Sequence, residues 1–250
     1  MTGQKLNLHH IDTKPPEGMD KKQMKKKTKK LAKEIALLQE QFYANSDRSM
    51  LVVLQGMDSS GKDGTTREIF RYASPNGVKV TSYKKPTEEE FAHDFLWRIH
   101  KNTPKKGHIS VFNRSHYEDI LIQYVHGWID DKKRDERMAA INAFERLLVN
   151  DANTIIVKLY LHLSNERQKE KLEERKLEED KFWKHNPSDW DERKHWDDYQ
   201  EAYQYVLVNS HFPWTVVPAD SRTYRNYVAT QKIHEVLTSL NMSWPPLQTS

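Results

Sequence analysis

A glycine-rich loop between a strand and a helix constrains the fold of this chain more than any other feature. Residues 56–62 fit the pattern G-x-x-x-x-G-K, within the segment GMDSSGKDG. The apolar run LVVLQ (51–55) before it is typical of a buried parallel strand, and the residues after Lys62 have helical spacing. At such a turn, backbone N–H groups and the helix N-terminus surround phosphate, and the lysine reaches a terminal phosphate. The motif therefore predicts a phosphate-binding loop, and an ordinary glycine-bearing turn is the alternative.

Two acidic residues depart from the usual form of this motif. Asp63 stands where a Ser or Thr hydroxyl normally contacts magnesium. Asp58 lies inside the loop, where phosphate would repel it unless a cation lay between them. Because magnesium prefers carboxylates together with phosphate oxygens, Asp58 is a candidate metal ligand. A turn-stabilising Asp is the alternative.

Strands alternate with helices along the rest of the chain. Beyond residues 51–55, hydrophobic patterns predict strands at 78–83, 108–113, 154–163 and 215–220. This alternation predicts an α/β fold of right-handed βαβ units, with a parallel sheet covered by helices on both faces. Residues 1–20 are predicted to form an irregular N-terminal arm, and residues 21–250 a single domain.

Two capping-box spacings predict helix starts. Thr87 and Glu90 precede a helix expected to continue through Ile99. Ser188 and Asp191 precede a helix with an aromatic stripe, which is more typical of packing than of a base-stacking platform.

A charged, tryptophan-rich stretch at about 164–200 lies between two predicted strands and is interpreted as an inserted helical lid. Arg167, Lys171 and Arg175 recur at i, i+4 and i+8 beside a parallel stripe of glutamates. Like charges four residues apart destabilise an isolated helix, so a separate basic stripe favours a polyanionic partner. The alternatives are a solvent-facing helical hairpin and stripes that neutralise each other.

A second polar cluster, NRSHYED (113–119), follows the predicted strand at 108–113. Side chains at the carboxyl end of a parallel strand face the ligand crevice. Arg114 has the planar shape for bidentate phosphate contact, and Glu118 can orient an acceptor or a metal-bound water. A helix-capping cluster with salt bridges is the alternative.

Composition excludes several classes of protein. The absence of cysteine excludes a disulfide scaffold, a cysteine-ligated metal site and a cysteine nucleophile. The chain shows neither a membrane span nor a signal peptide, which predicts a soluble, cytoplasmic protein. The net charge of +4 is small for a nucleic-acid binder, yet eight lysines crowd residues 21–33. That block predicts a local anionic partner or a solvated helix face.

The order of motifs resembles the polyphosphate kinase 2 family. The shared segments are GMDSSGKDG, FNRSHYED, RKLEEDKFWKHNPSDWDERKHWDDYQEAY, PWTVVPAD and RNYVAT, spread over residues 30–240. The resemblance implies a three-layer P-loop kinase core with a helical lid. It also implies Mg²⁺-dependent phosphoryl transfer between inorganic polyphosphate and nucleoside mono- or diphosphates (AMP, ADP, GDP), in a homo-oligomer that binds neither nucleic acid nor membrane.

Carried over by position, the resemblance assigns the site. The catalytic residues would be Asp58, Lys62, Arg114 and Glu118, with Asp58 as the metal ligand. The phosphate- and nucleotide-binding residues would be Gly56, Ser59, Ser60, Gly61, Lys62, Asp63, Gly64, Thr65, Arg98, Arg114, Lys171 and Arg175.

The chain departs from the family at three places. Asn113 replaces a frequent Asp, His116-Tyr117-Glu118 replaces Trp-Tyr-Asn, and Lys171 replaces a frequent Arg. The second change resembles the subgroup that accepts both mono- and diphosphates. An ATP-dependent P-loop kinase, a non-catalytic nucleotide-binding module and a nucleic-acid binder are the rival interpretations.

Overall fold

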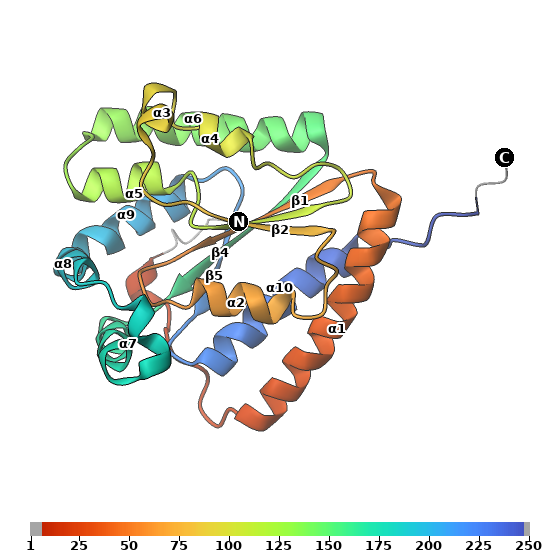
Figure 1. The fold of residues 1–250 in the computed structure, drawn as a ribbon, viewed down its shortest axis with the longest axis horizontal. Helices are drawn as coiled ribbons and strands as arrows, with labels where there is room; N and C mark the ends of the chain where they lie inside the picture. The colour runs from red at the N-terminus through yellow and green to blue at the C-terminus, as the bar shows by residue number, and fades with distance from the viewer. Residues whose placement is uncertain (1–6, 248–250) are drawn as a thin grey trace.

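One five-stranded parallel sheet forms the centre of the computed structural model, which describes residues 7–247 (Figure 1). The strand order is β2-β3-β1-β4-β5, so β1 is central and pairs with β3 and β4. The strands are β1 (Ser49–Gln55), β2 (Val78–Ser82), β3 (Ile109–Asn113), β4 (Thr154–His162) and β5 (Trp214–Pro218). Each falls within about a residue or two of a predicted strand, which confirms the parallel α/β prediction.

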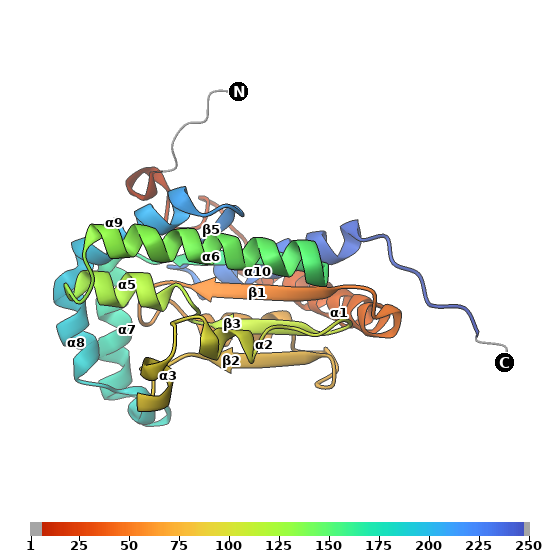
Figure 2. The same ribbon diagram turned by 90° about the horizontal axis from the view of Figure 1, so that it is seen from above.

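Helices cover both faces of the sheet and make three layers (Figures 1 and 2). On one face lie α1 (Lys21–Asn45), α2 (Lys62–Ile69) and α10 (Arg222–Ser239). On the other lie α4 (Trp97–His100), α5 (Glu118–Val125), α6 (Asp131–Ala152) and α9 (Trp196–Asn209). The remaining helices are α3 (Glu88–Ala92), α7 (Asn165–Leu177), α8 (Ser188–Glu192) and the 3₁₀ turns Leu8–His10, Glu179–Lys184 and Arg193–His195.

Burial on both faces explains the continuous apolar run of β1. All seven residues of this strand are buried. Leu51 and Val53 pack into the cluster beneath α5, α6 and α9, whereas Met50, Val52 and Leu54 pack into the cluster beneath α1, α2 and α10. Because successive side chains of a strand point to opposite faces, a strand covered on both sides reads as a nearly continuous apolar run without alternating polar residues.

The helix predicted from Thr87 through Ile99 is two helices. The capping box of Thr87 and Glu90 is present and starts α3. The helix stops before Asp94, whose side chain accepts a hydrogen bond from the N–H of Leu96 at 2.9 Å. Such local bonding competes with helical hydrogen bonds, and it starts a new turn that leads into α4.

The capping box predicted at Ser188 is wrong. Ser188 is the first residue of α8, the residue before it is Pro187, and that helix start has no side-chain cap. The side chain of Asn186 accepts a hydrogen bond from the N–H of Ser188 at 3.2 Å instead. An Asx-type turn therefore precedes this helix.

The lid helices α7 and α8 stand beside the carboxyl ends of the strands (Figures 1 and 2). The described part of the N-terminal segment packs onto the core: Leu8 is buried, and the Thr13 hydroxyl contacts the Asp220 carboxylate at 2.8 Å. None of the described helices is long and apolar enough to cross a lipid bilayer. The ends of β1 and β3 are neighbours in the sheet, so the two polar clusters that follow them lie together.

Candidate phosphate-binding site

The phosphate loop (residues 56–64) has a backbone shape that requires glycine at two positions. Gly56 has φ +150° and Gly61 has φ +95°, and Ser59 between them has φ +65°. A Cβ on Gly61 would lie 2.0 Å from Nη1 of Arg225, and one on Gly56 would lie 2.7 Å from the carbonyl oxygen of Leu161. At both positions a side chain is excluded by the positive φ angle and by the lack of space for a Cβ.

Side-chain donors surround the carbonyl oxygens of this loop. Three of the donors are cationic and one is an amide, and they come from α2, α7 and α10. The hydrogen bonds are Lys62 Nζ to Gly56 (2.7 Å), Gln168 Nε2 to Asp58 (3.1 Å), Lys171 Nζ to Ser59 (3.3 Å) and Arg225 Nη1 to Ser60 (2.9 Å). Positive charge from three separate helices therefore converges on a single loop.

These cations are crowded and poorly solvated, and their pKa values reflect it. Burial, then Arg114, lowers the pKa of Lys62 to about 8. Burial, then Arg225 and Arg167, lowers the pKa of Lys171 to about 7. Burial also lowers the pKa of the Arg225 guanidinium to about 10. An anion bound at the loop would relieve this repulsion, so the site is suited to a highly charged phosphate compound.

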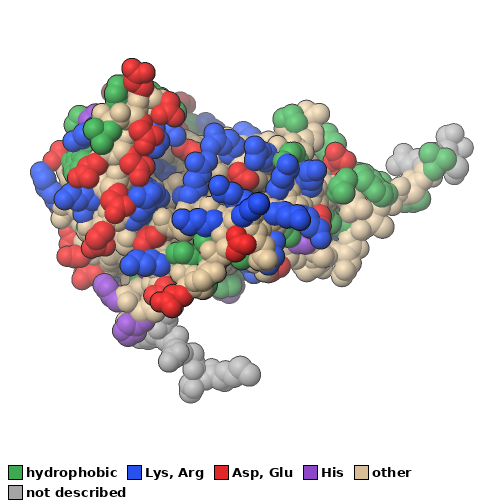
Figure 3. Space-filling model, turned by 90° about the horizontal axis from the view of Figure 1, so that it is seen from below, with side chains coloured by type: hydrophobic (Ala, Val, Ile, Leu, Met, Phe, Trp, Pro, Cys, Tyr) green, Lys and Arg blue, Asp and Glu red, His purple; other side chains and the backbone are tan. Residues whose placement is uncertain are grey.

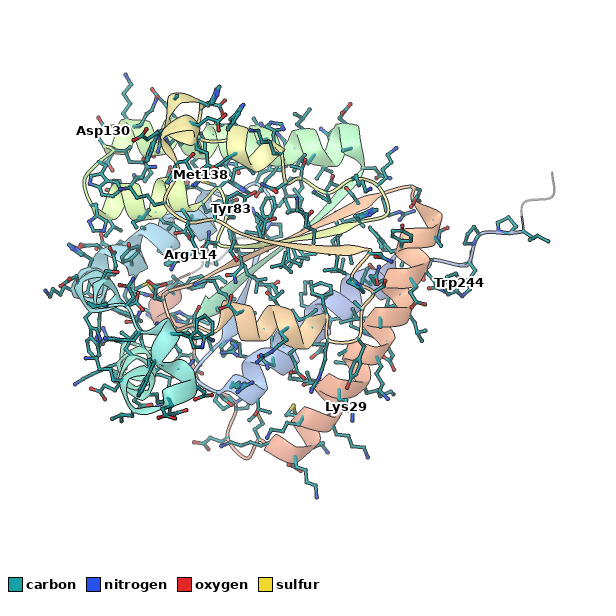
Figure 4. The ribbon with its side chains drawn as sticks, viewed as in Figure 1. Lys29, Tyr83, Arg114, Asp130, Met138 and Trp244 are labelled. Carbon is teal, nitrogen blue, oxygen red and sulfur yellow. The ribbon has the colours of Figure 1, made fainter. Side chains whose placement is uncertain are left out.

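Arg114 joins the phosphate loop to the turn after β3. Its guanidinium donates to the carboxylate of Asp58, and its second terminal nitrogen lies 3.4 Å from Oε2 of Glu118. Figure 4 shows Arg114 at the end of the sheet that faces the lid. Burial pushes the pKa of Asp58 upward, but Arg114 and Lys62 outweigh it and hold this pKa below its usual value. Glu118 and Asp58 in turn raise the pKa of Arg114.

The loop also holds polar atoms suited to a ligand. Among the described residues, the hydroxyl oxygens of Ser59 and Ser60 are buried without a hydrogen-bond partner. A buried hydroxyl without a partner is unfavourable, and a phosphate oxygen would satisfy it. Asp58 is an ionised carboxylate beside these hydroxyls. No three His, Asp or Glu side chains of residues 7–247 gather into a metal site of their own, so an ion here would share its ligands with phosphate.

The remaining loop positions are occupied by contacts within the protein. The side chain of Asn113, the last residue of β3, donates to the carboxylate of Asp63. The hydroxyl of Thr65 donates to the carbonyl of Gly61 at 3.1 Å, as a helical residue bonds to the preceding turn. The phosphate-binding roles assigned to Asp63, Gly64 and Thr65 stay predictions, as do the roles of the other site residues.

The basic stripe of the lid divides into three different environments. Arg167 pairs with Glu170 at 2.5 Å and Glu174 at 3.2 Å, so its charge is neutralised along α7. Lys171 reaches the phosphate loop, as described above. Arg175 pairs with Asp189 of α8 at 2.6 Å, and its charge also contributes to the lowered pKa of Asp58. The alternative in which the basic and acidic stripes neutralise each other therefore holds for Arg167 but not for Lys171.

Arg98 lies in a separate buried cluster. It donates to Asp119 at 3.1 Å and to the carbonyl of Lys84 at 2.9 Å. Burial raises the pKa of Asp119 although Arg98 opposes the shift. The pair lines a cavity of 380 Å³ whose wall includes Phe91, Phe95, Trp128 and Arg137. A mixture of aromatic and cationic groups suits a nucleobase with its phosphates. Asp119, which lines this cavity, directly follows Glu118 in the chain, so the cavity lies close to Glu118.

Arg225 and Gln168 are two site residues that the sequence analysis missed. Arg225 stands in the segment RNYVAT, which served for the resemblance but received no role. Gln168 lies one residue after Arg167 and was hidden among the charges of the lid. The aromatic stripe of α9 packs in the core through the buried Tyr199 and Tyr203, which confirms the packing interpretation.

A basic surface extends away from the loop across the α1, α2 and α10 face, and Figure 3 shows a broad band of Lys and Arg side chains there. All eight lysines of residues 21–33 are exposed on α1. A cavity of 620 Å³ on this face is lined by Arg67 of α2, Arg71 just after α2, and Arg222 of α10. We call these residues the α1–α2 basic surface.

Comparison with known proteins agrees with this geometry. The family model described as polyphosphate kinase 2 matches residues 18–245. A Meiothermus ruber protein named AMP/ADP-polyphosphate phosphotransferase is 40% identical over 88% of this chain and 83% of its own length. A Rhodopseudomonas palustris protein named ADP-polyphosphate phosphotransferase is 37% identical over 83% of this chain and 77% of its own. The crystal structure of polyphosphate kinase 2 from Arthrobacter aurescens TC1 superposes with a TM-score of 0.94 at 37% identity, covering 99% of this chain and 90% of that one.

Proposed function

This chain belongs to the polyphosphate kinase 2 family, and we propose that it transfers phosphoryl groups between inorganic polyphosphate and nucleoside mono- or diphosphates such as AMP, ADP and GDP. The observation that carries the proposal is the convergence of Lys62, Lys171 and Arg225 on one phosphate loop. Phosphoryl transfer needs positioning and charge neutralisation more than a covalent nucleophile. The buried Lys62 and Arg225 and the half-buried Lys171, which share no acidic partner, supply both for a polyanion.

The side chains around the loop divide the work of the reaction. Lys62 and Arg114 neutralise the phosphoryl group in transit, and Lys171 and Arg225 bind the donor chain beside it. Glu118 orients the acceptor through Arg114 or a bound water, and the cavity next to Arg98 holds the nucleoside. Arg175 completes the lid above the loop. These roles are supported by the contacts of each residue described above.

Asp58 is the residue that would hold Mg²⁺, together with phosphate oxygens and water. Its carboxylate is ionised, as its lowered pKa requires, and the unpartnered hydroxyls of Ser59 and Ser60 leave room for phosphate oxygens beside it. When bound, the ion neutralises charge on the transferred group. The homo-oligomer implied by the family stays a prediction, which light scattering would test.

An ATP-dependent kinase of a small molecule is the second candidate function. It shares the phosphate loop and the lid but has no use for an extended anion path. The α1–α2 basic surface, with its row of exposed lysines and arginines, favours polyphosphate over this alternative.

One assay separates these functions. The purified protein is incubated with Mg²⁺, long-chain polyphosphate and either ADP or AMP, and newly formed ATP or ADP is measured. We expect formation that depends on polyphosphate and is lost in Lys62→Ala. Binding of nucleotide without turnover would identify a non-catalytic module, and turnover only with ATP as donor would identify the second candidate.

A further inference from the structure

A completely buried polar network lies behind the turn that carries Arg114 and Glu118. Lys158 Nζ, on β4, donates to Glu145 Oε2 at 2.8 Å and to the Tyr117 hydroxyl at 2.9 Å. That hydroxyl donates to Glu145 Oε1 at 2.8 Å, and His116 Nε2 lies 3.3 Å from the same oxygen. Tyr117 and the side chains of Lys158, Glu145 and His116 have no exposed surface.

Stability alone does not explain this network. Removing two charges from water costs free energy that their attraction barely repays, so an apolar pair of similar size is often as stable or more stable. Burial raises the pKa of Glu145, but His116 and Lys158 outweigh it, and the carboxyl stays ionised. Because a carboxylate only accepts hydrogen bonds, His116 donates to it through Nε2, and Nδ1 is left buried without a partner among residues 7–247.

The turn itself is held in an uncommon conformation. Arg114 has φ +61°, in the left-handed region that residues other than glycine seldom occupy. Such a residue keeps this conformation only when its surroundings fix it. The next residue, Ser115, accepts a hydrogen bond from Gln55 at 3.1 Å. The two after it, His116 and Tyr117, are the ones that enter the buried network.

The network therefore fixes the chain directly between the two site residues. Arg114 precedes the anchored positions, and Glu118 begins α5 immediately after them. We propose that Lys158 and Glu145 are positioning residues, which hold the β3–α5 turn so that Arg114 meets Asp58 across the phosphate loop and Glu118 faces the acceptor. This inference rests on the proposed function, since it assigns Arg114 and Glu118 a part in transfer.

The test replaces the buried pair by apolar residues of similar size, Lys158→Met with Glu145→Leu. The double variant leaves neither charge unpaired, so we expect it to fold. Its melting temperature should lie somewhat below that of the wild type, because His116 Nε2 and the Tyr117 hydroxyl lose Glu145 as their acceptor. We expect kcat to fall by about tenfold to a hundredfold, because a small misplacement of a positioning group is costly. The KM for polyphosphate, which other residues bind, should change by less than about twofold.

A double-mutant cycle with Arg114→Ala distinguishes positioning from a general structural effect. If the network acts through Arg114, this substitution costs less in the Lys158→Met/Glu145→Leu background than in the wild type. The cycle is measured on kcat and, by calorimetry, on the Kd for ADP. The inference would be overturned if the effects of Arg114→Ala and of the double substitution simply multiplied, both in kcat and in the Kd for ADP. A folded double variant with wild-type kcat would also overturn it.

If the double variant does not fold, Tyr117→Phe, which removes one buried hydroxyl from the same network, takes its place in the cycle. If the wild type shows no transfer, the proposed function fails, and the cycle measured on the Kd for ADP still decides the inference.

Discussion

The ammonium group of Lys171, on the lid helix α7, donates a hydrogen bond to the carbonyl oxygen of Ser59 in the phosphate loop, 3.3 Å away. This contact joins the lid to the loop through a cation that forms no ion pair within 4 Å among residues 7–247, and the carboxylates of Asp220 and Glu174 act on it only from farther away. Burial, Arg225 and Arg167 together lower the pKa of Lys171 to about 7. Entry of a phosphate chain would give this ammonium an anionic partner and favour its protonated form.

Binding of polyphosphate should therefore weaken as pH rises through neutrality. Below the pKa of about 7, Lys171 already carries its proton, and above that pH binding must first take one up. The KM for polyphosphate should rise by up to about tenfold per pH unit between pH 7 and pH 8.5. In Lys171→Arg the guanidinium stays charged throughout, so the rise should be smaller. The measurement is KM across pH 6 to 8.5 in both proteins.

The ionisation of polyphosphate itself is the same for the two proteins, so their difference reports Lys171. The KM for ADP, measured in the same series, is the second reference. Equal pH profiles for wild type and Lys171→Arg would show that Lys171 does not govern donor binding.

Asp58→Asn tests whether the loop carboxylate holds the metal. Asn has the same size and keeps the loop packed, but it removes the charge that Arg114 contacts. Loss of a single preorganised electrostatic contact costs about a hundredfold or more in rate, and we expect that loss in kcat with an unchanged melting temperature. A Mg²⁺ titration should show weaker activation by the ion. Near-normal turnover at limiting Mg²⁺ would contradict the metal role.

Glu118→Asn tests the choice of acceptor. The Glu118 carboxylate lies 3.4 Å from Arg114 and starts α5 beside the cavity that Asp119 lines. Losing the carboxylate that orients the shorter acceptor through Arg114 or a bound water should lower kcat/KM for AMP at least about tenfold more than for ADP. Glu118→Gln keeps the length of the side chain without its charge, and therefore separates charge from shape. Equal losses on AMP and ADP would leave Glu118 with a structural role alone.

Local patterns were enough to predict the sheet and the loop. The five strands are short apolar runs bounded by glycine, proline or polar residues, and the phosphate loop is a contiguous motif whose torsions only glycine permits at Gly56 and Gly61. The break before Asp94 was missed because it depends on one side chain that bonds its own backbone.

Long-range pairs could not be predicted in this way. Arg225 lies 165 residues after Ser60, to which it donates, and nothing in the intervening sequence marks the pair. The sequence analysis did not single out Lys158, which lies within the apolar run of β4. Its partner Glu145 lies on a helix rich in charge, where no spacing distinguishes it. Whether each cation of the lid stripe is neutralised likewise depends on its partner in the fold. Arg167 contacts the carboxylate of Glu170, whereas Lys171 contacts the carbonyl oxygen of Ser59.

The α1–α2 basic surface provides the last prediction, which concerns salt. Figure 4 places Lys29 on the lower part of α1, away from the loop, so this surface could serve only the distant part of a long chain. A linear polyanion releases counterions when cations bind it, and the logarithm of its affinity falls with the logarithm of salt concentration. Replacing the exposed Lys25, Lys26, Lys29 and Lys33 by Gln should flatten that slope by up to about 0.7 for each lysine in contact. Turnover at saturating polyphosphate should stay unchanged, since these lysines lie outside the loop.

The matched control replaces the exposed Lys105, Lys106, Lys132 and Lys133 by Gln, which removes the same charge from outside α1. The KM for long-chain polyphosphate is measured across a salt series in the wild type and both variants. If contact with the chain is responsible, only the α1 variant has the flatter slope, and a short oligophosphate abolishes the difference because it does not reach α1. Equal flattening in both variants would mean that net charge alone acts, and an unchanged slope in the α1 variant would make its lysines an ordinary solvated helix face.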